Sequence, residues 1–431
     1  MPRRRIAVAA TAVLAVSLML LPATHPADAG RPTLPPLSAD VVVQLDPVVG
    51  TTIDQLNAAH GTVTVDSIVG SAGTFLVAAP DGRAQAALAA ELGAAPGVLF
   101  AEPNLSVGSP EVTGLPGRAL WSFSPPSQAT AQYAQSLLQL DAAHGLSTGA
   151  GVTVAVIDSG VQLVPAPHPA LAGSLLPGID FVDNDNVPDD ARNGIDTSGN
   201  GIADEEAGHG THVAGIVHMV APAAKIMPVR ALDPDGVGLM FTVAKAMQWA
   251  ADNGANVVSM SLGAHSAANV IKDMTRSLQA RGVVVVAAAG NDGKNTTNFP
   301  AGAKCVVAVA SSGATDAVSS FSTVGDFVSV SAPGEDITST FPYTTSGYAS
   351  WSGTSMATPF VSGQAALLRS LDPTLTNGQV LAYIAGTTSP LAGGPAPAGS
   401  GRIDVVASLR AAAAGQLPSA IAAGIDKNCL K

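Results

Sequence analysis

The sequence predicts an α/β fold in which a mostly parallel sheet is flanked by helices, preceded by a small ferredoxin-like α+β unit. Two observations lead to this prediction. Within residues 40–108, short β-rich and helix-forming stretches follow one another in the order β-α-β-β-α-β. From residue 151 onward, nearly continuous apolar strands alternate with helical stretches, as expected for strands buried on both faces of a sheet.

The small unit has the elements of a split βαβ pattern, in which two helices cover one face of a four-stranded sheet. Apolar and β-branched residues predict strands at 41–45, 62–68, 74–78 and 98–107. Apolar residues at helical spacing, each time followed by a glycine, predict helices at 52–60 and 84–92.

The larger unit is expected to span residues 133–410. Apolar runs predict strands at 152–157, 225–229, 256–260, 283–288 and 305–310. Helices are expected at 210–218, 242–253, 270–281 and 360–368. In open parallel sheets, functional residues gather at the carboxyl ends of the strands.

The flanking segments predict export. Three arginines precede an apolar run at 6–21, and small residues at 27 and 29 offer a cleavage site, so residues 1–29 are typical of a secretory signal peptide. A retained membrane anchor is the weaker alternative, because that run is shorter than the about 20 residues that a bilayer span needs. Linkers are expected at 30–39 and 109–132, and an Ala/Gly-rich tail at 411–431.

Composition excludes several classes of protein. The 431 residues are enough for a large core, only 12% are charged, and the net charge is −12, with no basic block beyond the N-terminus. We therefore expect no nucleic-acid partner and no membrane anchor after signal cleavage. Two cysteines, Cys305 and Cys429, allow at most one disulfide bond. We expect a monomer.

Three glycine-flanked motifs carry reactive side chains. The first, at 154–160, is an apolar strand that ends in Asp158. A dinucleotide-binding fold has such strands too, but its Gly-x-Gly-x-x-Gly pattern is missing here. The second, at 208–215, places His209 and His212 at the head of a helix. A zinc-binding pair is the alternative interpretation, although the His-Glu-x-x-His pattern is absent.

The third motif, at 352–359, leads into an apolar helix. Because Pro359 fits only an early helical turn, Ser355 is expected near the helix N-terminus, where free backbone N–H groups favour a developing anion. Taken alone, Ser355 could equally be an N-cap residue.

With Asp, His and Ser in this order, the chain resembles the subtilisin-like serine proteases over most of its length. The resemblance implies that Ser355 is the nucleophile, His209 the base and Asp158 the residue that orients the base. The chemistry is consistent with this, because a serine hydroxyl needs a base near neutral pH, and a buried carboxylate fixes the imidazole tautomer. No cofactor is then needed for catalysis.

The same resemblance implies an oxyanion hole and a substrate groove. Asn291, which could otherwise be an ordinary turn residue, would stabilise the oxyanion together with the backbone N–H of Ser355. Extended peptide would pair with two edge segments, and small residues would line the primary pocket. These substrate-binding residues are Gly236, Val237, Gly238, Ser261, Leu262, Gly263, Ala288, Ala289 and Gly290. The roles of Asp292 and Asn298, and with them the primary specificity, stay open.

An acidic insertion separates Asp158 from His209. Within it, oxygen-bearing side chains alternate as in a calcium loop, and these candidate ligands are Asp196, Ser198, Asn200 and Asp204. Ala207 stands where an EF-hand would have its bidentate glutamate, so a solvated acidic loop is an equally good interpretation. A structural calcium ion is therefore only one of two expectations.

The resemblance also gives the small unit a role. Residues 40–108 would be a propeptide that assists folding and inhibits the enzyme, although an unrelated small domain is an alternative. A cut somewhere in 107–121 would release the mature enzyme. The sequence thus predicts a secreted, self-processing serine endopeptidase acting on proteins or peptides. The alternative from another class is a catalytically silent member that binds peptides through the same groove.

Overall fold

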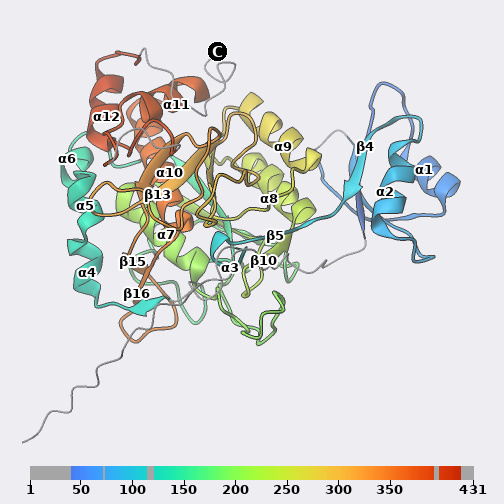
Figure 1. The fold of residues 1–431 in the computed structure, drawn as a ribbon, viewed down its shortest axis with the longest axis horizontal. Coiled ribbons are helices and arrows are strands. Elements are labelled where there is room, and N and C mark those ends of the chain that lie inside the picture. Colours follow the sequence, from blue (N-terminus) through green and yellow to red (C-terminus); the bar gives the residue numbers. More distant parts are fainter. Residues whose placement is uncertain (1–39, 71–72, 114–120, 393–397, 419–431) are drawn as a thin grey trace, which may run out of the picture. The chain divides into compact units, whose positions relative to one another are not determined.

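The structure is a computed structural model that describes residues 40–70, 73–113, 121–392 and 398–418 (Figure 1). The predicted signal peptide and the linker at 30–39 lie outside the described residues, as does the greater part of the predicted tail. Among the residues that are described, no helix is both long and apolar enough to cross a bilayer.

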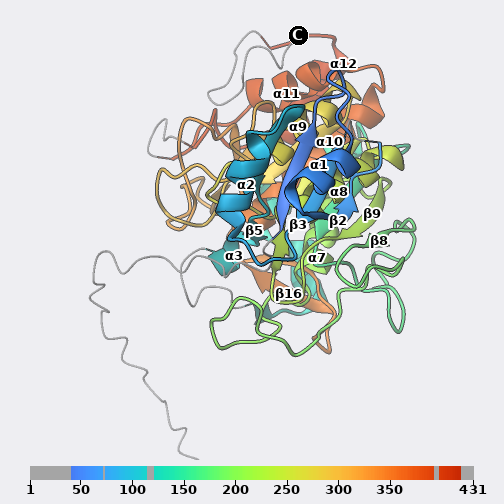
Figure 2. The same cartoon turned by 90° about the vertical axis from the view of Figure 1, so that its right-hand side faces the viewer.

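The small unit has the predicted order of elements. Its strands are β1 (Val41–Leu45), β2 (Val63–Ser67), β3 (Thr74–Ala78) and β4 (Val98–Pro103), and its helices are α1 (Ile53–His60) and α2 (Gln85–Gly93). The strands pair antiparallel in the order β2-β3-β1-β4. Alternate residues of β1 point to opposite faces, so Val41 and Val43 pack with α1 and α2, which cover one face of the sheet (Figure 2).

The opposite face of this sheet packs on the larger unit. Val42 of β1 and Leu76 of β3 belong to the same apolar cluster as Met247 of α8 (Met240–Asp252). At the edge of this contact, the carboxylate of Glu102 accepts hydrogen bonds from the backbone N–H groups of Asn269 and Val270, at the start of α9 (Asn269–Ala280). Carboxylates are favoured at such a helix N-terminus, so this contact ties the two units together.

The run predicted as one strand at 98–107 is divided in two. β4 ends at Pro103, and a separate strand, β5 (Ser106–Gly108), pairs antiparallel with β10 (Val237–Leu239) of the larger unit. Asn104 marks the break: its backbone N–H still bonds Asp40, while its side chain accepts from the backbone N–H of Phe241. The local pattern is extended throughout, and only the long-range partners differ.

The larger unit contains the predicted parallel sheet, which confirms the fold class. Seven strands lie in the order β14-β13-β12-β11-β7-β9-β8 and all pair parallel. Their bounds are β7 (Thr153–Asp158), β8 (Ile179–Asp180), β9 (Lys225–Arg230), β11 (Val257–Met260), β12 (Val284–Ala288), β13 (Val307–Ser312) and β14 (Val330–Pro333).

Two apolar clusters cover the two faces of this sheet. Val154 and Val156 of β7 pack with α7 (His209–Val220) and α10 (Thr354–Leu371), whereas Ala155 and Ile157 pack with α8 and α9. Both faces of the strand are therefore buried, as its continuous apolar sequence predicts.

Further elements frame the sheet. They are α3 (Pro110–Thr113), β6 (Ser122–Phe123), α4 (Pro126–Ala131), α5 (Tyr133–Leu137), α6 (Leu140–His144), β15 (Ile337–Thr340), β16 (Tyr348–Trp351), α11 (Asn377–Gly386) and α12 (Val405–Ala413). Part of the predicted linker at 109–132 is thus helical or extended. The first three residues of the predicted tail continue α12, because Ala411 and Ala412 still pack against the core. Cys305 is disulfide-bonded, and the other cysteine, Cys429, lies outside the described residues.

Candidate active site

The three motif residues lie at the ends of secondary-structure elements on one edge of the sheet. Asp158 is the last residue of β7, His209 is the first residue of α7, and Ser355 is the second residue of α10. All three side chains are buried. The predicted early helical position of Ser355 is thus observed, with Pro359 in the second turn of the same helix.

Asp158 and His209 form a short, buried contact. The Nδ1 atom of His209 lies 2.6 Å from Oδ1 of Asp158, which also accepts the backbone N–H of Ser159. Since a carboxylate only accepts, Nδ1 carries a proton, and Nε2 faces the carboxyl groups of Glu111 and Glu206. Trp351 packs edge-on against the imidazole, with 5.3 Å between ring centroids. Burial alone would lower the pKa of His209, but Asp158, followed by Glu111, raises that pKa well above its ordinary value.

Glu111 of α3 lies between His209 and Ser355. The Oγ atom of Ser355 donates to Oε2 of Glu111 at 2.7 Å, and Nε2 of His209 lies 3.4 Å from the same oxygen. The Ser355 hydroxyl and the His209 imidazole therefore both contact Oε2 of Glu111. They do not form a direct hydrogen bond with each other in this arrangement. Glu111 is 5% exposed, so its charge is shielded from water.

Asn291 contacts the second oxygen of the same carboxylate. Its Nδ2 atom donates to Oε1 of Glu111 at 2.9 Å, and its Oδ1 atom accepts from the backbone N–H and the hydroxyl of Thr354. Thr354 thereby fixes the amide so that its N–H₂ group faces Glu111. A Cβ atom on Gly353 would lie 1.8 Å from Glu111 Oε1, so only glycine leaves room for an oxygen at this point.

The predicted edge segments pair with the chain's own residues 106–109. Gly108 exchanges two backbone hydrogen bonds with Gly263, and the backbone N–H of Ser109 donates to the carbonyl of Gly236. β10 contributes Val237 and Gly238 to the other side of this ladder. Ser261 and Leu262 are buried beside it, and Ser261 Oγ donates to the carbonyl of Ser355. These two segments thus hold an extended strand of the same chain through backbone hydrogen bonds.

The small residues predicted for the primary pocket lie at the carboxyl end of β12, of which Ala288 is the last residue. Ala288 and Ala289 are buried, and the side-chain amide of Asn298 donates to the carbonyl of Ala289. Gly290 has φ +112°, and a Cβ atom there would lie 1.8 Å from Asn298 Nδ2, so this position requires glycine. Asp292 lies apart from this contact, with its carboxylate 3.2 Å from Nε2 of His265.

Comparison with known proteins identifies the family. The model of the family described as "Subtilase family" matches residues 149–404, which is more than half of the chain. The chain belongs to the subtilase family. Thermitase of Thermoactinomyces vulgaris is 42% identical over 268 residues, covering 62% of this chain and 92% of that protein. Subtilisin BL of Lederbergia lenta is 36% identical over 285 residues, covering 64% of this chain and 97% of that protein.

A solved structure shows the same fold. A protease of Pseudoalteromonas arctica PAMC 21717 superposes with a TM-score of 0.59 at 32% identity, covering 64% of this chain and 94% of that chain. This subtilase is a serine-type endopeptidase, and subtilases need no cofactor for catalysis.

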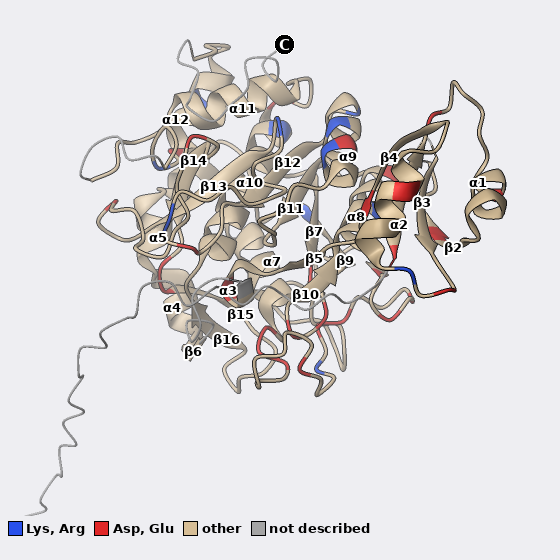
Figure 3. Ribbon diagram, turned by 45° about the vertical axis from the view of Figure 1, so that its right-hand side comes forward, with Lys and Arg blue, Asp and Glu red and all other residues tan. Residues whose placement is uncertain are grey.

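The acidic insertion of the subtilase forms the long loop between β8 and α7 (Figure 3). Asp196 accepts hydrogen bonds from the backbone N–H groups of Gly199, Asn200 and Gly201, and from Ser198 Oγ. Asp204 accepts from two other backbone N–H groups of the loop. Both carboxylates therefore hold the loop's own backbone.

Asp190, in the same insertion, supports the site and was not predicted. Its two carboxylate oxygens accept four hydrogen bonds, from Ser159 Oγ, from the backbone of Gly208, and from the backbone and hydroxyl of Thr211. It therefore joins the residue after Asp158 to the start of α7. Burial raises the pKa of Asp190 to about 6. No local pattern distinguishes Asp190 from the other acidic residues of the loop.

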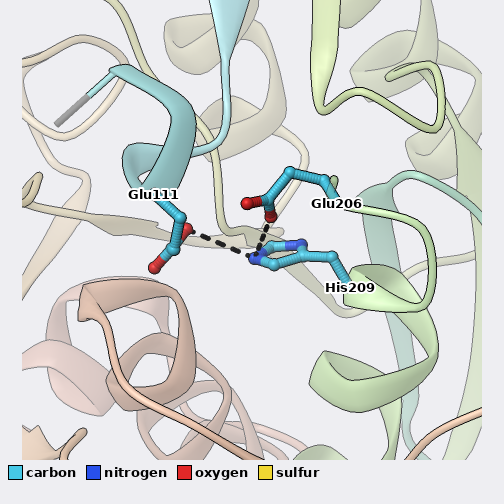
Figure 4. A group of neighbouring side chains, drawn as sticks. All are labelled: Glu111, Glu206 and His209. Atoms are coloured by element: carbon cyan, nitrogen blue, oxygen red, sulfur yellow. Dashed lines mark ion pairs between the residues drawn. The ribbon is translucent and has the colours of Figure 1, made fainter. Parts of the chain in front are cut away.

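Glu111 and Glu206 were also missed as site residues. Glu206 is fully buried, and its Oε2 atom lies 3.9 Å from Nε2 of His209, the same nitrogen that Glu111 faces (Figure 4). The one signal for Glu111 was its position, since it is the only acidic residue in the stretch 109–132, where processing was expected. Glu206 carries no such signal, because it follows another glutamate in an acidic loop.

His212, three residues after His209, has a structural role. Its Nε2 atom lies 3.0 Å from the carbonyl of Ile337 and 3.1 Å from that of Ala349, so it donates to β15 and β16. Burial, followed by the charge on His209, lowers the pKa of His212 to about 3. The buried imidazole therefore stays neutral at all but very acid pH.

This lowered pKa predicts a loss of stability in acid. Because the unfolded chain takes up the proton near pH 6.5, the contribution of His212 is complete above that pH. It falls by about 1.4 kcal/mol per pH unit as the pH drops toward 3. His212→Gln keeps a donor but cannot titrate, so its free energy of unfolding should depend less on pH. Denaturation at pH 7.5, 5.5 and 4.5, in a Ser355→Ala background, measures this. Parallel pH profiles for the two proteins would contradict the prediction.

Proposed function

We propose that the protein is an exported serine endopeptidase, made as a self-processing precursor, in which Asp158, His209 and Ser355 form the catalytic triad. The observation that supports it most directly is the contact set around one carboxylate. Ser355 Oγ, His209 Nε2 and Asn291 Nδ2 all face Glu111, which occupies the space where a reacting carbonyl group would lie.

The first chemical step follows from these positions. When a peptide carbonyl replaces Glu111, His209 Nε2 takes the proton of Ser355 as its Oγ attacks the carbonyl carbon. Asp158 keeps the proton of Nδ1 in place and stabilises the imidazolium that forms. His209 then returns its proton to the leaving amine, which yields an acyl-enzyme that water hydrolyses by the reverse sequence.

The negative charge on the carbonyl oxygen would be stabilised by Asn291 and by the backbone N–H of Ser355. Asn291 Nδ2 already donates to a carboxylate oxygen, so it is oriented before the reaction and needs no rearrangement during it. The first turn of α10 adds free N–H groups and the positive end of its dipole.

We infer that residues 40–108 act as a propeptide and that the uncut chain is latent. β5 fills the groove as a substrate strand would, and the chain turns into α3 at Pro110. The carboxylate of Glu111, rather than a peptide carbonyl, then accepts the hydrogen bonds of the Ser355 hydroxyl and of the Asn291 amide. Cleavage in the interval 107–121 would require α3 to unwind and a peptide bond to take the place of this carboxylate.

Labelling with a serine-directed fluorophosphonate tests both parts of this proposal. The processed enzyme should be labelled at Ser355 within minutes, and the uncut precursor at least about tenfold more slowly, because Glu111 covers the hydroxyl. Mass spectrometry of the tryptic digest identifies the labelled residue, and that of the intact chain gives the processing point. A folded, processed chain that is not labelled at Ser355 would support the silent peptide-binding alternative instead.

A structural calcium ion at Asp196, Ser198, Asn200 and Asp204 remains a proposal, as does the monomeric state. Both carboxylates of the loop would have to give up bonds to backbone N–H groups to bind the ion. The alternative, an acidic loop held by its own backbone, accounts for the same residues without a metal.

A further inference from the structure

Three potential metal ligands meet at the latent active site. Oxygen atoms of Glu111 and Glu206 and the Nε2 atom of His209 lie within 4.8 Å of one another, and all three residues are buried (Figure 4). Among the described residues, this is the one group of three or more His, Cys, Asp or Glu side chains that converge in this way.

The surroundings of Glu206 are the second observation that indicates a metal site. Both of its carboxylate oxygens are buried and have no hydrogen-bond partner, and Nε2 of His209 has none either. Within the described part of the chain, no lysine or arginine forms an ion pair with Glu206, Glu111 or Asp158. Three buried carboxylates therefore face one imidazole. A buried carboxyl group without a polar partner is costly to ionise, and coordination of a metal ion is one way to satisfy its oxygens.

The histidine is already oriented as a metal ligand. Its Nδ1 atom is held by Asp158 at 2.6 Å, which is the carboxylate–histidine arrangement that fixes the tautomer and raises the basicity of a metal-bound imidazole. Its Nε2 atom is thereby the ring nitrogen that is available to bind a metal ion. The structure uses the same Asp–His pair in a geometry that suits either proton transfer or metal binding.

The distances fit zinc. Two ligands at about 2.0–2.1 Å from a tetrahedral zinc ion lie roughly 3.4 Å apart. His209 Nε2 is 3.4 Å from Glu111 Oε2 and 3.9 Å from Glu206 Oε2, and all three ligand atoms lie within 4.8 Å of one another, so the three groups could contract around one ion. An imidazole nitrogen among the ligands favours Zn²⁺ over Ca²⁺ or Mg²⁺, which prefer oxygen alone.

We propose that the uncut precursor binds one Zn²⁺ ion through Glu111, Glu206 and His209, with water or the Ser355 hydroxyl as fourth ligand. The proposal rests on the latent precursor inferred above. Zinc on Nε2 removes the atom that must accept the Ser355 proton, so the bound ion holds the precursor inactive. Because Glu111 lies in the segment where processing is expected, its departure would leave two ligands and release the ion.

The test uses full-length Ser355→Ala precursor, which keeps all three ligands and cannot process itself. After incubation with zinc sulfate and gel filtration, elemental analysis should find one zinc ion per chain, and the melting temperature should rise. Glu206→Gln and Glu111→Gln in this background should each weaken zinc binding by more than about a hundredfold, since they remove direct ligands.

Glu205→Gln is the matched control. Glu205 accepts from Asn200 and Ser198 in the acidic loop and is one residue from Glu206, so its loss should leave zinc affinity within about threefold. Binding that survives both ligand variants, or falls equally in Glu205→Gln, would overturn the proposal. So would a precursor that binds no zinc.

Wild-type chain supplies a second measurement that does not depend on the folding of any variant. Zinc should slow self-processing at least about tenfold, and a chelator should restore the rate, while casein hydrolysis by processed enzyme is unaffected by the same zinc concentration. A self-processing rate that zinc leaves unchanged would contradict the inference alone. Absence of casein hydrolysis in metal-free buffer would instead contradict the proposed protease function.

Discussion

Ser355→Ala is expected to stop self-processing, lowering its rate by about 10⁶-fold, the magnitude that loss of the nucleophile has in subtilisin, a relative. The Ser355 hydroxyl is the proposed nucleophile, and it lies on α10 near the Asn291 amide, both groups donating to the Glu111 carboxylate. Mass spectrometry of the intact chain over time measures the cut. Casein hydrolysis by any processed material provides a second readout.

Ser352→Ala is the control for this experiment. Ser352 lies three residues before Ser355, and its hydroxyl accepts the backbone N–H of Asp336 instead of facing the cleft. Its loss should change the self-processing rate by no more than about threefold. A Ser355→Ala chain that still cuts itself at a tenth of the wild-type rate would remove the catalytic assignment, provided that both variants melt at temperatures close to that of the wild type.

Asn291→Ala is expected to slow self-processing by about 10²–10³-fold, as loss of the equivalent donor does in subtilisin. The reason is electrostatic: the amide donates to an oxygen in the buried cleft, where a developing negative charge has no water to stabilise it. The proposed self-processing would be intramolecular, so its rate would report the chemical step without a contribution from substrate binding.

Asn291→Asp separates this role from a packing role. The aspartate has the same shape and can still accept from Thr354, but it replaces the donor by a negative charge. Its rate should therefore fall below that of Asn291→Ala. An Asn291→Asp chain that processes faster than the alanine variant would show that the amide acts only by holding Thr354 and α10 in place.

Local patterns were sufficient to predict the sheet and the positions of the motif residues. The apolar run of β7 ends at Asp158, and the early proline places Ser355 in the first turn of α10. These predictions depend on only a few neighbouring residues, because strand burial and helix starts are governed by short-range periodicity and by backbone hydrogen bonding. The exact bounds moved by a few residues, since packing decides where a strand or helix ends.

Glu111, Asp190 and Glu206 could not be found in this way. The sequence by itself determined the split βαβ unit, the parallel sheet and the glycine-flanked motifs. Only the tertiary structure decided that the predicted strand at 98–107 divides, that β5 pairs with β10, and that Glu111 consequently reaches Ser355. Asp190 and Glu206 became site residues in the same way. Each depends on contacts between distant segments, and a carboxylate's neighbours, rather than its sequence position, decide whether it caps a helix, orients an imidazole or remains in solvent.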